Sequence, residues 1–184
     1  MLGKFIIAGV ITIAVVATTA EIAFPPKPVI FYNPSPSAQI GFYRLSQHQA
    51  PELGDQVAAY APEWARIMAD ERGYLPYDYP LIKTVSAAQG DEVCYNKMGV
   101  RVPDGSVIPV QVRDRQGREM PVKSGCAVLK PGEYFLISPD VQAGFDSRYF
   151  GPVSTENILG TVIFLGSKKT PNHLDSLENG GFEG

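Results

Sequence analysis

The stretch Asn33-Pro34-Ser35-Pro36-Ser37-Ala38-Gln39-Ile40-Gly41-Phe42-Tyr43-Arg44 places two hydroxyls in a turn directly before an apolar strand. Pro34 and Pro36 fix their own φ angles and push the residues before them out of the α region, so this turn is expected to be rigid. A rigid turn suits a reactive hydroxyl, and Ser37 is the candidate nucleophile. Because serine also favours turns for structural reasons, the turn alone does not establish that role.

After this turn the chain has short apolar or alternating runs separated by turn signals such as Gly54-Asp55 and Pro131-Gly132. Many short strands with frequent turns predict a mainly β domain, a β-rich barrel or sandwich. One segment, 62–73, has proline in its first turn, apolar residues at helical spacing and glycine at its end, which predicts a short inserted helix. The predicted strands are 41–45, 56–60, 81–85, 92–95, 107–112, 127–129, 134–137 and 161–165.

Composition limits the class of protein. With 184 residues and 45% hydrophobic content, the chain can bury one core of ordinary size. Its net charge is -3, and it contains no basic run interleaved with aromatic residues. We therefore expect no nucleic acid among its partners.

The N-terminus predicts a membrane anchor. Residues 5–24 are apolar apart from Glu21, which is long enough for one transmembrane helix, and Lys4 favours a cytoplasmic N-terminus with the domain across the membrane. The small residues 17–20 leave open a cleaved signal peptide instead, and both interpretations export the domain. The predicted organisation is an anchor at 1–24, a proline-rich spacer at 25–36, a domain at 37–166 and a disordered tail at 167–184.

The chain has two cysteines, Cys94 and Cys126. In an oxidising compartment an isolated pair is more often a structural disulfide than a reactive dithiol. Their spacing does not suit a CxxC redox site. His48 and His173 are far away in the sequence, so we expect no metal site and no cofactor.

One lysine stands in the middle of an apolar strand. Leu81, Lys83 and Val85 share one face of the predicted strand, so the Lys83 amine is expected to be poorly solvated. Burial lowers the pKa of a lysine, and a neutral amine could take the proton of the Ser37 hydroxyl. The alternative is a lysine on an edge strand with its amine in water. Neither histidine has the setting of an oriented base.

Linked motifs carry a family resemblance from about residue 33 to 166. They are the Ser37 turn followed by Gly41-Phe42-Tyr43, the run Leu81-Ile82-Lys83 leading into Gly90-Asp91-Glu92-Val93-Cys94, and Phe145-Asp146-Ser147-Arg148-Tyr149-Phe150-Gly151. In this order they resemble the type I signal peptidases, and more narrowly their conjugative-transfer branch, the TraF-like pilin-maturation peptidases.

The resemblance implies a Ser/Lys protease with Ser37 as nucleophile and Lys83 as general base. Ser35 matches the position from which a hydroxyl joins the Ser37 backbone N–H in an oxyanion hole. Asp146 matches an acidic residue that assists the lysine, with a surface salt bridge as the structural alternative. Arg148 is expected to hold the Asp146 loop by pairing with a carboxylate.

Two positions depart from the patterns of these enzymes. Gln39 stands where the branch typically has proline, and Gly144 replaces the serine that precedes the Asp-Ser-Arg box in housekeeping signal peptidases. Without that serine, Lys83 is expected to have Asp146, and not a serine hydroxyl, as its partner. Both departures favour a dedicated substrate over general secretory processing.

The implied protein is a single-pass protein of the bacterial inner membrane with a periplasmic catalytic domain. Its expected partners are an exported propilin-like substrate, the membrane and components of a conjugation system. Processing would pass through an ester on Ser37, followed by either hydrolysis or cyclisation of the substrate. The alternatives are a non-catalytic periplasmic assembly component with a peptidase-like fold and, more remotely, a thiol redox protein.

Overall fold

A computed structural model describes residues 9–12, 30–46, 50–139 and 144–167. Of the predicted anchor, only 9–12 is described, and it is helical. None of the described helices is long and apolar enough to cross a membrane. The rest of the anchor, the start of the spacer, nearly all of the predicted tail and both histidines lie outside the described residues.

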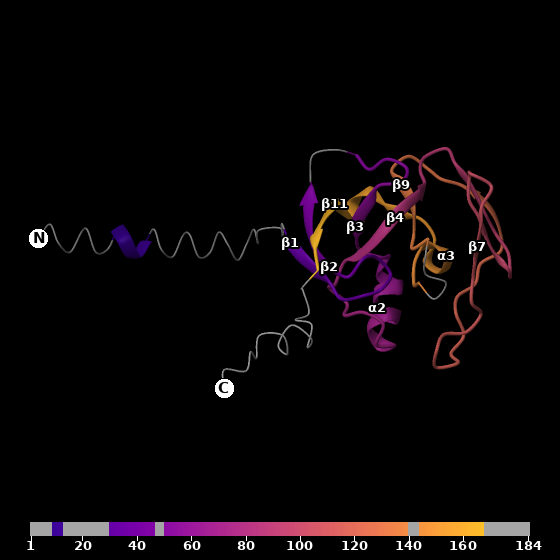
Figure 1. Ribbon diagram of the computed structural model, residues 1–184, viewed down its shortest axis with the longest axis horizontal. Coiled ribbons are helices and arrows are strands. Elements are labelled where there is room, and N and C mark those ends of the chain that lie inside the picture. Colours follow the sequence, from indigo (N-terminus) through magenta and orange to yellow (C-terminus); the bar gives the residue numbers. More distant parts are fainter. Residues whose placement is uncertain (1–8, 13–29, 47–49, 140–143, 168–184) are drawn as a thin grey trace, which may run out of the picture.

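The described residues confirm a mainly β fold with a short inserted helix (Figure 1). The strands are β1 (Ile30–Asn33), β2 (Gly41–Ser46), β3 (Gln56–Ala59), β4 (Leu81–Ala87), β5 (Glu92–Tyr95), β6 (Gly99–Arg101), β7 (Val107–Pro109), β8 (Gly125–Val128), β9 (Glu133–Ile137), β10 (Val153–Ser154) and β11 (Ile158–Gly166). Besides the helical residues 9–12, the helices are α2 (Glu63–Glu71), α3 (Ser147–Phe150) and the 3-10 turn η1 (Thr155–Asn157).

The strands form two sheets. The larger has seven strands in the order β1-β2-β11-β3-β4-β9-β10, and the smaller has four in the order β7-β6-β5-β8. Neighbouring strands pair in antiparallel fashion, for example β3 with β4 and β4 with β9. β4 is therefore an interior strand, and the turn after it leads the chain into β5 of the smaller sheet (Figure 1).

The core lies against both sheets. Ala65 of α2 packs with Val57, Val85 and Leu136 from the neighbouring strands β3, β4 and β9. The helix covers the larger sheet with the small residues Ala65 and Ala69. Trp64 and Ile67, two of the apolar residues whose spacing predicted the helix, are instead 45% and 44% exposed, so the expected buried face is wrong. A second cluster joins the two sheets and contains Ala87, Val93, Tyr95, Val100, Val102, Leu129, Phe135 and Ile137.

Several boundaries differ from the sequence-based expectation: β4, β8 and β11 run over Leu81–Ala87, Gly125–Val128 and Ile158–Gly166, and β6 and β10 were not predicted. The predicted strand 107–112 ends at Pro109, which pairs with Gly99, and beyond it only the Val110 N–H in the described chain continues the pairing, to the Met98 oxygen at 3.3 Å. The predicted spacer contains β1, which pairs with β2 from Ile30↔Arg44 to Asn33↔Gly41. This pairing makes the Ser37 segment the connection between two neighbouring strands.

Candidate active site

The turn that carries Ser37 is closed by the side chain of Asn33. Its buried amide nitrogen donates to the backbone oxygens of Ser35 at 2.8 Å, Ala38 at 3.2 Å and Gln39 at 3.1 Å. Its oxygen accepts the Ser35 N–H at 3.1 Å. The rigidity expected from the prolines therefore has a second source, which the sequence analysis missed.

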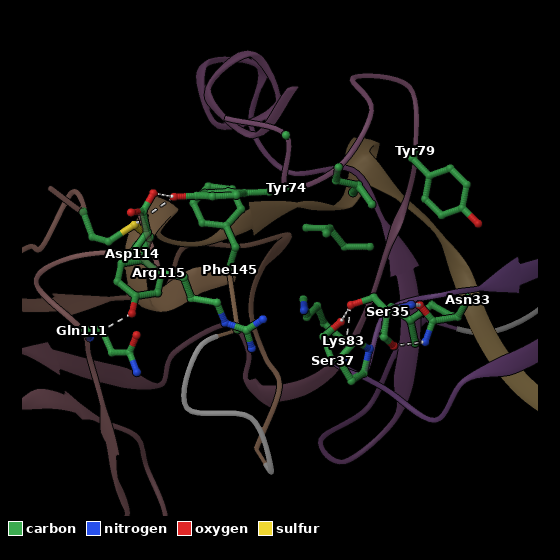
Figure 2. A pocket seen from close by; sticks show the side chains of 18 of the residues that line it. Asn33, Ser35, Ser37, Tyr74, Tyr79, Lys83, Gln111, Asp114, Arg115 and Phe145 are labelled. Atoms are coloured by element: carbon green, nitrogen blue, oxygen red, sulfur yellow. Dashed lines mark hydrogen bonds between the residues drawn. The ribbon is translucent and has the colours of Figure 1, made fainter. Parts of the chain in front are cut away.

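The two serines of this turn are hydrogen-bonded to each other (Figure 2). The Ser35 hydroxyl donates to Ser37 Oγ at 3.0 Å and accepts the Ser37 backbone N–H at 3.2 Å. Both groups expected to form an oxyanion hole thus lie side by side. In that role they would exchange these bonds for bonds to a substrate oxygen.

Lys83 is buried in the middle of β4, with 2% of its surface exposed. This position excludes the alternative of an edge-strand lysine with its amine in water. Burial lowers the pKa of Lys83 from 10.5 to about 8; nearby Asp146 opposes that shift and nearby Arg148 adds to it. A substantial fraction of the amine is therefore neutral near physiological pH, as a general base requires.

The hydrogen-bond partner of the Lys83 amine is Ser138, which the sequence analysis missed. Lys83 Nζ donates to Ser138 Oγ at 2.7 Å in the buried interior. The pairing of β4 with β9 joins Thr84 to Ile137, so one further step in that register sets Lys83 opposite Ser138. The expectation that Lys83 would have Asp146 and not a serine as its partner is therefore wrong.

Asp146 acts one step further away, at the N-cap of α3. Its carboxylate accepts the Ser138 backbone N–H at 3.0 Å and two bonds from the Arg148 guanidinium, at 2.7 and 2.8 Å. Both side chains of this ion pair are at most 1% exposed. This burial excludes the alternative in which Asp146 forms a salt bridge on the surface. Arg148 pairs with a carboxylate, as expected, and together they hold the backbone that carries Ser138.

Position 144 has no room for a side chain. A Cβ there would lie 2.8 Å from Arg148 Nη2, 3.1 Å from Asp146 Oδ2 and 3.2 Å from Ser138 Cβ. The space that a serine at 144 would occupy is thus filled by the ion pair and by Ser138. Gly144 is therefore required by the same packing that places the Ser138 hydroxyl beside Lys83.

A pocket of about 330 Å³ brings the candidate residues together (Figure 2). Ser35, Ser37 and Lys83 line it, while Asp146 and Arg148 are buried behind it. In the described chain Ser37 Oγ is bonded to Ser35 and Lys83 Nζ to Ser138, without a direct hydrogen bond between the two. The apolar residues that line the pocket include Leu75, Tyr79, Pro80, Leu81, Ile82 and Phe145.

Cys94 and Cys126 form a disulfide between β5 and β8, away from the pocket. Among the described residues, one group could offer three metal ligands: Glu92 and these two cysteines. Because both sulfurs are bonded to each other, this group is not an assembled metal site.

The chain is similar in sequence to known proteins. The family model described as "Signal peptidase, peptidase S26" matches residues 2–166, so the chain belongs to the signal peptidase S26 family. Within it, the chain belongs with the TraF proteins: it is 36% identical to a plasmid transfer protein TraF of Escherichia coli, over 71% of this chain and 78% of that protein. It is also 36% identical to a probable conjugal transfer protein TraF of Sinorhizobium fredii, over 70% and 72% of the two chains.

The resemblance read from the motifs is therefore confirmed at the level of the family. A solved signal peptidase I from Enterococcus faecalis aligns with 62% of this chain and 98% of its own, with a TM-score of 0.37 and 17% identity. That alignment is too distant to inform the site.

Proposed function

We propose that this protein is a membrane-anchored serine endopeptidase in which Ser37 is the nucleophile and Lys83 the general base. The observation that carries the proposal is a buried lysine, with its pKa lowered to about 8, in the same pocket as a serine on a rigid turn. Membership of a signal peptidase family supports the same chemistry.

In the first step, neutral Lys83 takes the proton of Ser37 Oγ as that oxygen attacks a substrate carbonyl. The Ser37 N–H and the Ser35 hydroxyl stabilise the oxyanion. Protonated Lys83 then gives its proton to the leaving amine, and the substrate remains as an ester on Ser37. Ser138 accepts one amine hydrogen, which restricts the nitrogen lone pair to the two remaining tetrahedral positions.

The second step depends on the nucleophile that reaches the ester. Water gives a linear product, whereas the N-terminal amine of the substrate itself gives a cyclic one and no free carboxylate at the new end. Lys83 serves as the base in either case. The cyclic product is lighter than the linear one by one water.

The substrate proposed here is an exported pilin-like precursor. The TraF relatives are named as plasmid or conjugal transfer proteins, which supports a role in conjugation. The apolar run at 5–24 would place the pocket at the outer face of the bacterial inner membrane, in the periplasm, where such a precursor emerges.

The test is mass spectrometry of a pilin precursor co-expressed with the full chain, with Ser37→Ala or with Lys83→Ala. We expect processing by the unmodified protein alone, and the mass of the product distinguishes hydrolysis from cyclisation. Processing that continues with both variants would favour a non-catalytic assembly role and would contradict this proposal.

A further inference from the structure

The segment 111–120 forms the side of the pocket that lies across from Ser37 (Figure 2). Within this segment, Asp114 is the acidic residue that lines the pocket. Its carboxylate already accepts hydrogen bonds from the Tyr74 hydroxyl, from Arg118 Nε at 2.6 Å and from the Gln116 N–H at 2.9 Å. Although its burial opposes this, these bonds hold the pKa of Asp114 below its usual range. Asp114 is a structural ion and not a receptor for substrate cations.

The same segment is fixed to the end of α2. Arg72 donates to the backbone oxygen of Glu119 at 3.0 Å, and Arg118 Nη2 donates to the backbone oxygen of Arg72 at 3.2 Å. Asp114 and Gln116, the two neighbours of Arg115, are both held by hydrogen bonds. The backbone that presents Arg115 is therefore pre-organised, which lowers the cost of binding through it.

Arg115 is the uncommitted cation of this lining. Within the described ranges its guanidinium has no hydrogen-bond or ion-pair partner, whereas Arg113 donates to the Gly117 oxygen at 2.7 Å and to Glu119 at 3.3 Å. Figure 2 shows the Arg115 side chain extending from the segment into the pocket. Among the described lining residues, Asp114 is the one acid, against the three basic residues Lys83, Arg113 and Arg115.

We propose that Arg115 binds a carboxylate of the substrate close to the bond that is cleaved. The inference rests on the proposed function, because it takes the occupant of the pocket to be a peptide. A guanidinium pairs with a carboxylate through two parallel hydrogen bonds, which gives specificity as well as affinity. The carboxylate is either an Asp or Glu side chain or the C-terminus of the precursor.

The test measures peptide binding to the full-length Ser37→Ala protein in detergent, so that no cleavage interferes. The probes are fluorescent peptides with an alanine-rich centre, made with Glu or with Gln in the flank, and each with a C-terminal acid or amide. Because Arg115 is exposed, we expect a peptide with the recognised carboxylate to bind about twofold to fivefold more tightly than its neutral partner, as for a solvent-exposed ion pair. The pair that shows the difference identifies the source of the carboxylate.

Adding Arg115→Gln should remove this preference, while Arg115→Lys should retain part of it. The control is Arg101→Gln, which makes the same change in net charge on β6 of the smaller sheet, outside the pocket. A preference that survives Arg115→Gln, equal binding of all the peptides or no binding overturns the proposal. Cleavage is measured separately, with the protein that retains Ser37. If that protein does not cleave the peptides but the carboxylate preference in binding is present, the proposed function is contradicted and the role of Arg115 in binding is not.

Discussion

Replacing Ser138 with alanine should impair the base without unfolding the domain. The substitution removes the only oxygen that accepts a hydrogen bond from Lys83 Nζ in the described structure, at 2.7 Å. Hydrogen bonds to charged groups contribute about 1.5 to 3 kcal/mol, so we expect kcat/KM to fall about tenfold to hundredfold. An acceptor favours the charged amine, so its loss should also lower the pKa of Lys83 below about 8.

The assay is the pH dependence of kcat/KM for a peptide substrate, with the midpoint reporting the free enzyme. Ser147→Ala is the matched control, because it deletes another buried hydroxyl of the same region, which accepts the Leu136 N–H at 2.9 Å and does not contact Lys83. It should cost stability while leaving the midpoint in place. An unchanged rate and midpoint in Ser138→Ala would refute the role assigned to this serine.

Position 144 offers a rescue. Gly144→Ser alone should destabilise the fold, because its Cβ would press on the Asp146–Arg148 ion pair. Combined with Ser138→Gly, which removes one of the three close contacts, the new hydroxyl should restore part of the activity lost in Ser138→Gly. Equal activity of the double variant and Ser138→Gly would show that the hydroxyl cannot be relocated.

Three further predictions concern stability. Asn33→Ala should lower the free energy of unfolding by about 2 to 3 kcal/mol and reduce kcat, because it leaves three backbone oxygens of the Ser37 turn without their donor; unchanged denaturant midpoint and rate would count against this. Lys83→Met should stabilise the protein at pH 7 by at most about 3 kcal/mol, since the folded state binds the lysine proton more weakly than the unfolded state does. That gain should shrink as the pH rises from about 8 to 10.5, and a variant less stable than the parent at pH 7 would contradict the burial argument. Replacing both Cys94 and Cys126 with alanine should cost about 3 to 4 kcal/mol for a sequence separation of 32 and spare kcat, which thermal unfolding and peptide cleavage would test together.

Local patterns in the sequence predicted much of the fold and part of the site. Alternation along 81–85 correctly indicated a strand that buries Lys83. The helix at 62–73 was also correctly predicted, although it buries Ala65 and Ala69 and not its larger apolar side chains. The contact between Ser138 and Lys83 could not be predicted, because it depends on the register between β4 and β9, which a single sequence does not reveal. For the same reason, Gly144 was interpreted as the loss of a hydroxyl partner for Lys83. The hydroxyl that contacts Lys83 belongs to Ser138, at the end of β9.

Turn chemistry was the other gap. The prolines around Ser37 were evident, but the hydrogen bonds of Asn33 depend on the turn folding back over its side chain. Arg115 gave no signal in the sequence, because its placement depends on the contacts that fix segment 111–120 to α2.

The most direct test of the central claim is the rate at which Ser37 is acylated, measured between about pH 6 and 10. An alanyl peptide thioester would serve as the acyl donor, and intact mass spectrometry of acid-quenched samples would count the adduct. The buried amine predicts an adduct on Ser37 whose rate of formation rises with a midpoint near pH 8 and collapses in Lys83→Ala. A midpoint near 10.5, or a rate that does not depend on Lys83, would contradict it.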